Sequence, residues 1–149
     1  SAAGAVAVGV MAVTVGMGVE RELRRLSLTD HVGHVIFDAA GTTVVERAAD
    51  ACEASLVAEA AARGLHTSYR FSPGYGDLPL EVQPVLLDTL DARRRLGIAL
   101  SPQLLMTPTK SVTAIVGMYE RPQPTGHEHG LCRDCACNDF CKLRPCHRR

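Results

Sequence analysis

Five cysteines crowd the end of the chain in a pattern that suits a metal centre. The segment CRDCACNDFCKLRPCHRR spaces them as C-x2-C-x-C-x3-C-x4-C. Thiolates at such spacing can supply all four ligands of a tetrahedral zinc ion or of an iron–sulfur cluster. We expect one of these two and leave the choice open, because the bacterial ferredoxin run is one residue longer between its second and third cysteines. The predicted metal ligands are Cys132, Cys135, Cys137, Cys141 and Cys146.

Other interpretations of this tail stay open at the sequence level. Its cysteines could form disulfides during handling, and with few hydrophobic residues the tail could lack order without metal. Binding of nucleic acid is not expected, because the histidine of a zinc knuckle is missing at the needed place and Phe140 is the only aromatic side chain available for stacking. Crowded cysteines without a secretory signal favour a reducing compartment, so we expect a cytoplasmic protein.

The segment RFSPGYGD, residues 70–77, is the second place where chemistry is expected. Arg70 can bind a carboxylate through two parallel hydrogen bonds, and Tyr75 offers a ring face to a cation. Gly74 and Gly76 allow backbone amides to approach a ligand closely. The alternative is a strand-to-helix loop in which Arg70 makes a structural salt bridge. The predicted ligand-binding residues are Arg70, Pro73, Gly74, Tyr75 and Gly76.

Composition fits a globular chain with one main domain. The chain has 149 residues, of which 46% are hydrophobic and 21% are charged, and its formal net charge is zero. The apolar stretch AAGAVAVGVMAVTVGMG is interrupted by glycines and lacks a basic flank, so we expect neither a signal peptide nor a membrane helix. We predict a domain over residues 1–120, truncated at its N-terminus, followed by a linker and the cysteine tail over residues 121–149.

The first elements that must position these residues are a strand and two helices. Residues 5–15 predict a strand covered on both faces in the middle of a sheet, and residues 19–28 predict a short amphipathic helix. Asp30 is the expected N-cap of a long helix that Gly64 ends. Gly41 within it predicts close contact with the sheet. The expected core stripe of this helix is Val32, Val35, Ile36, Ala39, Val44, Ala48, Cys52 and Leu56.

The second half predicts further strands around one helix. Residues 65–71 predict a strand that leads into the RFSPGYGD loop, and a helix capped at Asp77 or Leu78 is expected to run to Gly97, with Pro84 kinking it or marking where it becomes regular. Two more strands are expected, over residues 98–100 and 111–119. The element order predicts an α+β fold with a mixed or antiparallel sheet packed with long helices.

Several ordered motifs together resemble a known family. RFSPGYGDLPLEVQPVLLDTL, LLMTPTKSVTAIVG and FDAAGTTVVERAADACE are similar to the activation (reactivation) domain of cobalamin-dependent methionine synthase, and closest to its small stand-alone relatives with a cysteine-rich C-terminus. The resemblance covers residues 12–117. It implies that fold, a place in a methionine synthase (methyltransferase) system of methionine biosynthesis, and partners that include a corrinoid-binding methyltransferase protein and possibly a reductase.

The same resemblance implies a ligand and residue roles. Domains of this family bind S-adenosylmethionine and present its methyl group to oxidised cobalamin during reductive methylation. The family's motif of an arginine, three residues, glycine and tyrosine falls on Arg70, Gly74 and Tyr75. The resemblance places Arg70 at the ligand's carboxylate and Tyr75 near the sulfonium. Met106, Lys110 and Ser111 are expected to support this site or to fill the core.

The functional alternative is a non-catalytic docking module. Such a module keeps the fold and a structural zinc or iron–sulfur tail, and it binds a partner of a corrinoid methyltransferase system without handling S-adenosylmethionine. The sequence contains no nucleophile beside a base, no Walker-type glycine loop and no helical His-Glu-x-x-His motif. Any catalytic contribution is therefore expected to come from holding a methyl donor against a corrinoid carried by another protein.

Overall fold

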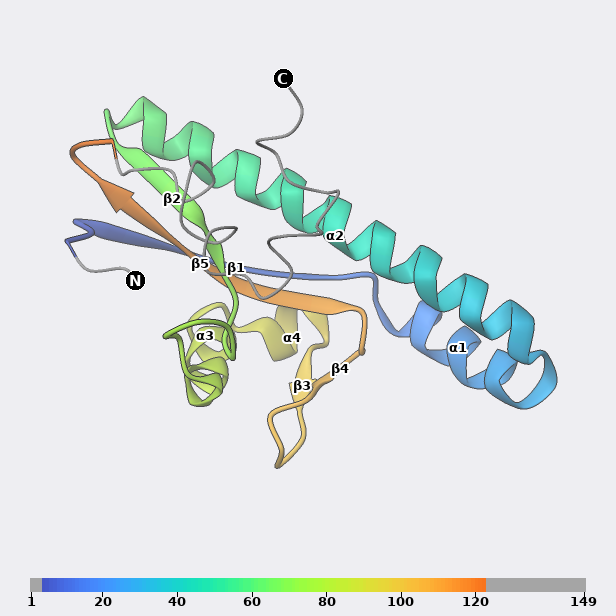
Figure 1. Cartoon of the computed structure of the whole chain (residues 1–149). Coiled ribbons are helices and arrows are strands. Elements are labelled where there is room, and N and C mark those ends of the chain that lie inside the picture. Colours follow the sequence, from blue (N-terminus) through green and yellow to red (C-terminus); the bar gives the residue numbers. More distant parts are fainter. Residues whose placement is uncertain (1–3, 123–149) are drawn as a thin grey trace, which may run out of the picture.

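The computed structural model describes residues 4–122 as an α+β arrangement with antiparallel sheets (Figure 1). The elements are β1 (Ala7–Thr14), α1 (Met17–Thr29), α2 (His31–Ala62), β2 (His66–Phe71), the 3-10 turn η1 (Leu80–Val82), α3 (Gln83–Thr89), α4 (Ala92–Leu96), β3 (Ala99–Leu100), β4 (Met106–Thr107) and β5 (Ser111–Tyr119). The predicted α+β class is therefore confirmed. The cysteine tail lies outside the described residues.

A three-stranded sheet in the order β1-β5-β2 forms the centre of the molecule. β5 pairs along its whole length with β1, from Ser111 opposite Thr14 to Met118 opposite Ala7. The prediction that the first strand lies in the middle of a sheet is wrong, because β5 takes that place and β1 is an edge strand. Two layers nevertheless cover β1, as expected for its apolar sequence: Met11 packs with Ala49 of α2, and Ala12 packs on the opposite side with the cluster around Leu87.

Pairing of β2 with β5 stops early. The register runs from His66 opposite Tyr119 to Phe71 opposite Ile115, and the chain then leaves the sheet. Within residues 4–122, the stretch 111–114 of β5 thus has a strand partner on the β1 side alone. This half-paired stretch of β5 lies between α2 on one side and α3 with β4 on the other (Figure 1).

Local signals set the ends of α2 as the sequence predicts. The side chain of Asp30 accepts a hydrogen bond from Gly33 N at 2.9 Å, a standard N-cap. At the other end Gly64 has a φ of 72°, and Leu65 N donates to Ala60 O while Gly64 N donates to Ala61 O. These two bonds form a Schellman motif, which requires the left-handed conformation that glycine adopts without strain.

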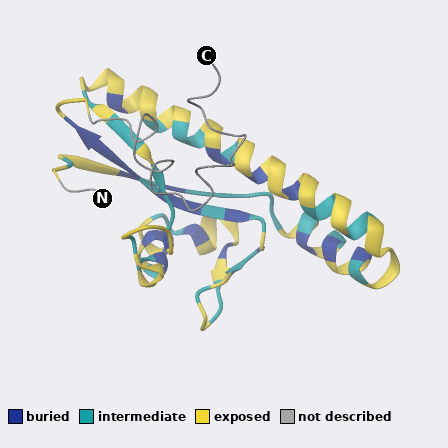
Figure 2. Cartoon of the chain, in the orientation of Figure 1, coloured by how far each residue is buried: buried dark blue, intermediate teal, exposed yellow. Residues whose placement is uncertain are grey.

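The expected core stripe of α2 is wrong over its first half. Four residues of the expected stripe are exposed: Val32 at 72%, Val35 at 67%, Ile36 at 65% and Val44 at 56%. The buried residues of α2 are instead Gly41, Val45, Ala49 and Ala60. The N-terminal half of α2 extends past the sheet and packs on α1, so its outer face stays uncovered among the described residues (Figure 2). Apolar residues occur all around this helix, and its sequence period therefore does not reveal which face is buried.

Gly41 contacts different neighbours from those predicted. A Cβ atom there would lie 3.4 Å from Lys110 Cγ and 3.5 Å from Val19 Cγ1. The close approach is thus to α1 and to the residue that precedes β5, rather than to the face of the sheet. Gly41 lets the stem of Lys110 cross α2 at short range.

The helix expected to run to Gly97 is divided into η1, α3 and α4. Pro84 lies in the first turn of α3, so it marks the start of a regular helix and does not kink one. Asp91 adopts a left-handed conformation with a φ of 50° and separates α3 from α4, which Gly97 ends as predicted. The break lets Leu87, Ala92 and Ile98 meet in one buried cluster below the sheet. β4, which pairs with β3, has no counterpart among the predicted elements.

Candidate functional site

The RFSPGYGD loop closes on itself through its own backbone. Gly74 and Gly76 have φ values of 89° and 58°, which require glycine-like freedom. Gly74 N donates to Leu78 O at 2.8 Å, and Tyr75 N donates to Ser72 O at 3.2 Å. The amide of Gly74, which the sequence suggested for a ligand, therefore shapes the loop. Pro73 is buried beneath it, and the side chain of Tyr75 projects from it with 72% of the residue exposed.

Arg70 is held by three carboxylates of α2. Its Nη1 lies 2.6 Å from Asp50 Oδ1 and 2.8 Å from Glu53 Oε2, and its Nη2 lies 2.9 Å from Glu46 Oε2. Glu53 also accepts from the backbone N of Arg70 at 3.2 Å. The hydrogen bond to Asp50 is the largest cause that raises the pKa of Arg70 above its usual range. The salt-bridge alternative thus describes this side chain, and contact of Arg70 with a ligand stays a prediction.

The signal for this cluster was present in the sequence. Glu46, Asp50 and Glu53 follow one another at spacings of four and three residues, which places them on one face of a helix. Three carboxylates face a single guanidinium, so the side of α2 next to the loop keeps an excess of negative charge.

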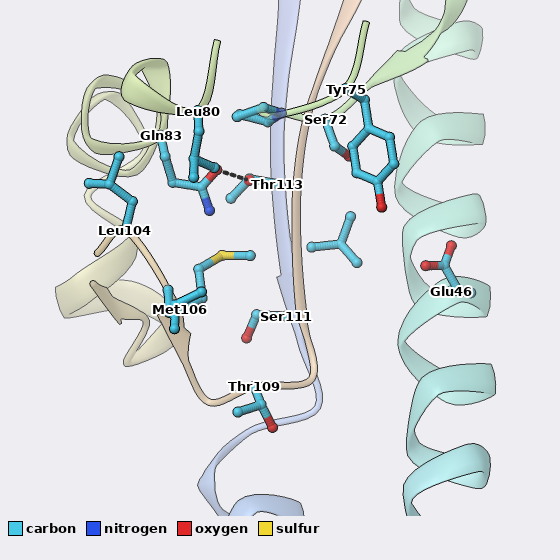
Figure 3. A pocket seen from close by; sticks show the side chains of 13 residues that line it. Glu46, Ser72, Tyr75, Leu80, Gln83, Leu104, Met106, Thr109, Ser111 and Thr113 are labelled. Atoms are coloured by element: carbon cyan, nitrogen blue, oxygen red, sulfur yellow. Dashed lines mark hydrogen bonds between the residues drawn. The ribbon is translucent and has the colours of Figure 1, made fainter. Parts of the chain in front are cut away.

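A cavity of about 450 Å³ opens beside the half-paired stretch of β5 (Figure 3). Its walls come from α2, the RFSPGYGD loop, η1 with the start of α3, the turn that leads into β4, and β5. Leucine, methionine, proline and valine side chains make up much of the wall, with hydroxyl and amide groups between them. The lining residues are Glu46, Ser72, Pro73, Tyr75, Leu80, Gln83, Leu104, Leu105, Met106, Thr109, Ser111, Val112 and Thr113.

Gln83 is one of the polar residues of this wall that were not predicted from the sequence. It is only 3% exposed, and its Oε1 accepts a hydrogen bond of 3.0 Å from Thr113 Oγ1, itself in a residue 2% exposed. Figure 3 shows the amide nitrogen on the cavity side of this bond, toward Met106. A weak signal existed, because Gln83 shares a helix face with Leu86 and Leu87, which are buried.

Buried Glu20 fixes the wall opposite Gln83. Its Oε2 accepts from Thr109 N at 2.9 Å and from Thr109 Oγ1 at 2.8 Å. These bonds connect the β4–β5 turn to α1. The hydrogen bond from Thr109 N is the largest cause that lowers the pKa of Glu20 below 4.5. Desolvation opposes this shift, and Arg24 contributes to it at 3.5 Å.

The three residues suggested as support for the site have different positions. Met106 and Ser111 line the cavity. Lys110 instead pairs with Asp38 at 2.8 Å and donates to Thr42 Oγ1 at 2.8 Å, on the α2 side. Ser111 Oγ donates to Pro108 O at 2.7 Å. Lys110 and Ser111 therefore hold the chain around the cavity, whereas Met106 offers an apolar surface to it.

Residues 4–122 contain no group of three or more His, Cys, Asp and Glu side chains placed to hold a metal ion. The predicted ligands Cys132, Cys135, Cys137, Cys141 and Cys146 lie outside the described residues. No helix in the described part of the chain has both the length and the apolar character needed to cross a membrane. Comparison with protein-family models and with curated proteins found no match to this chain.

Proposed function

We propose that this domain binds S-adenosylmethionine in the cavity and supports reductive methylation of a corrinoid carried by a partner protein. One observation carries the proposal. The two most informative motifs, RFSPGYGDLPLEVQ and LLMTPTKSV, are separated in sequence and line the same cavity. The first contributes Pro73, Tyr75 and Gln83, and the second contributes Met106 and Ser111.

Size and surface of the cavity suit a ligand of this kind. Sites for small molecules typically enclose roughly 300–1,000 Å³ and combine apolar walls with a few polar groups. The volume of about 450 Å³ and the mixed wall fall within this description. The half-paired stretch of β5 adds backbone polar groups along one side.

Charge at the α2 end of the cavity favours a cationic sulfonium. Glu46 lines the cavity, and the cluster around Arg70 has three carboxylates for one guanidinium. A neighbouring carboxylate and the face of an aromatic ring both stabilise a cation. Tyr75 supplies such a ring from the loop, on the same side of the view as Glu46 (Figure 3). In this proposal Arg70 positions the loop and balances part of the negative charge.

The methyl transfer itself needs groups that other components provide. S-Adenosylmethionine supplies the methyl group, a reductase supplies one electron to cob(II)alamin, and the corrinoid of the partner accepts the methyl group while S-adenosylhomocysteine leaves. Residues of this chain bind and orient the donor and leave its sulfonium open toward the partner. The exposed ring of Tyr75 at the cavity mouth fits a site that must present its ligand outward.

We extend the proposal to the C-terminal cysteines as a zinc or iron–sulfur site. A cluster there could relay the electron, whereas zinc would serve docking. Anaerobic preparation distinguishes them: visible iron–sulfur absorbance supports the relay, and a colourless protein with stoichiometric zinc contradicts it.

The docking module remains the second candidate because of one observation. Arg70, the residue that the resemblance places at the ligand's carboxylate, already has three anionic partners. A domain that only docks to a partner protein needs no contact between Arg70 and a ligand. This candidate predicts that the chain retains a corrinoid protein or a reductase and binds no S-adenosylmethionine.

Isothermal titration of S-adenosylmethionine into anaerobically handled protein tests the proposal. Saturable binding is expected, with affinity lowered by Tyr75→Ala and retained by the control Val85→Ala, which changes an exposed side chain of α3 outside the cavity. Binding that Tyr75→Ala and Val85→Ala weaken equally would contradict the role of Tyr75. Absence of binding in the unchanged chain would contradict the proposed function and favour the docking module.

A further inference from the structure

The buried amide nitrogen of Gln83 is a donor for which no residue in the described part of the chain is an acceptor. Among the described residues, Gln83 has one side-chain hydrogen bond, in which its oxygen accepts from Thr113. The residue is 3% exposed, so bulk water reaches it little. An unsatisfied buried donor destabilises a fold, and such groups are few in native proteins. In a cavity, such a donor is available to bind a ligand that supplies the missing acceptor.

The space in front of this nitrogen has apolar walls. Leu80, Leu104 and Met106 surround the amide, with Met106 directly across from it (Figure 3). Leu104 adopts a φ of 63°, a left-handed conformation uncommon for a residue with a side chain. Residues held in such conformations cluster at ligand sites. A flat apolar ring with polar atoms on its edge would bury its faces here and direct one edge to Gln83.

We propose that Gln83 recognises the adenine ring of an adenosyl ligand. This inference rests on the proposed function, which supplies the adenosyl group. A glutamine amide can donate from its nitrogen to a ring nitrogen of adenine and accept from the exocyclic amine, as in protein–DNA contacts. The amide oxygen has two lone pairs, and Thr113 uses one of them. Both halves of the adenine contact are therefore available.

Thr113 is the positioning residue for this contact. Its hydroxyl donates to Gln83 Oε1, and with this bond in place the amide nitrogen lies on the cavity side (Figure 3). Thr113 is 2% exposed in the central strand, and its position is set by the pairing of β5 with β1. The bond holds the Gln83 side chain in the cavity wall, where its amide nitrogen can donate to a ligand.

Inosine distinguishes this arrangement from general purine binding. Hypoxanthine has a carbonyl oxygen in place of the exocyclic amine, so its N7 and O6 both accept hydrogen bonds. An amide that pairs with N7 and the exocyclic amine of adenine keeps only one of these two hydrogen bonds to hypoxanthine, whichever way the amide is turned. A bidentate contact of this kind changes affinity by about 10- to 100-fold.

The test is isothermal titration of the full chain with adenosine, inosine and S-adenosylmethionine. The unchanged protein is expected to bind adenosine about 10- to 100-fold more tightly than inosine. Gln83→Glu should abolish that preference, because it replaces the donor with an acceptor. The matched control Gln103→Glu makes the same change at an exposed residue outside the cavity and should retain it. Thr113→Val should reduce the preference because the Gln83 side chain then loses the hydrogen bond that holds it in the cavity wall.

The outcomes separate this inference from the proposed function. Binding of S-adenosylmethionine with equal affinity for adenosine and inosine overturns the role of Gln83 and leaves the function standing. Binding of adenosine with preference over inosine, but not of S-adenosylmethionine, supports Gln83 and contradicts the function. No binding of any of the three overturns both. If Gln83→Glu does not fold, the preference of the unchanged protein and its reduction by Thr113→Val decide the question.

Discussion

Arg70 and Gln83 flank the same loop but differ in how much of their hydrogen-bonding capacity the fold uses. Arg70 is conspicuous in the sequence, and three carboxylates of α2 hold its guanidinium. Gln83 is inconspicuous, and its buried amide donates to no acceptor among the described residues. A residue type suited to binding therefore indicates a site only when the neighbouring residues leave its polar atoms without hydrogen-bond partners.

Substitution of Arg70 and substitution of Gln83 should therefore have different effects on stability and on ligand binding. Removal of Arg70 leaves three like charges facing one another, which costs stability. Removal of the Gln83 amide deletes the acceptor of Thr113 together with a donor that has no acceptor among the described residues, so it should cost less stability than loss of Arg70 and should remove a contact for a ligand.

Arg70→Met should lower the free energy of unfolding by about 3 kcal/mol, because it leaves partly buried Glu53 without a cation beside Glu46 and Asp50. Urea denaturation at neutral pH measures the change. Arg25→Met is the matched control, since it breaks an exposed pair with Glu22 that solvent screens and should therefore cost much less stability. Similar losses for both variants would show that the cluster is no stronger than a surface ion pair.

Gln83→Met should lower the free energy of unfolding by about 1–3 kcal/mol, because the side chain keeps its approximate volume but the buried hydroxyl of Thr113 loses its acceptor. The same denaturation experiment measures it. Its affinity for adenosine should nevertheless fall by about 10- to 100-fold. A large loss of stability with unchanged affinity would reverse the contrast and make Gln83 a structural residue.

Glu20→Gln tests the hydrogen bonds from Thr109 to Glu20 through the pH dependence of stability. The pKa of Glu20 is lowered in the folded state, so its carboxylate contributes stability above pH 4.5 that is lost as pH falls through the folded pKa. The variant should be less stable by about 1 kcal/mol at pH 7 and should show a shallower loss of stability on acidification. Denaturation curves between pH 3 and pH 7 measure both. Parallel curves for the two proteins would mean that Glu20 does not carry this dependence.

Gly74→Ala should cost about 1 kcal/mol, because its φ of 89° strains any other residue while the new Cβ meets only ordinary contacts with Leu80. Gly18→Ala is the contrasting change: it lies in α1 with open space around it and should stabilise the chain by about 0.5–1 kcal/mol. Thermal denaturation compares them. A neutral Gly74→Ala would show that the loop relaxes to another conformation.

Local features of this fold could be predicted from the sequence, whereas features set by distant contacts could not. Asp30, Gly64 and Gly97 act within one helical turn, so their roles were correct. The edge position of β1 and the exposed half of α2 depend on which elements meet in space. Because apolar residues occur all around α2, its sequence does not show which face of the helix is buried.

The candidate site also contains residues that could be predicted from local sequence and residues that depend on distant contacts. Pro73 and Tyr75 line the cavity, and their loop could be identified from its own residues. Gln83 depends on Thr113, 30 residues further along the chain, and no local pattern joins the two. The partners of Arg70 also come from far upstream, although their spacing on one helix face could have indicated them.

The most direct test of the central claim is a nuclear magnetic resonance titration of the protein with S-adenosylmethionine. If the ligand occupies the cavity, the side-chain amide signals of Gln83 and the methyl signal of Met106 should shift and saturate together. The methyl signal of Met17, which lies on α1 away from the cavity, should not move. Unchanged Gln83 and Met106 signals at high ligand concentration would contradict binding of S-adenosylmethionine in this cavity.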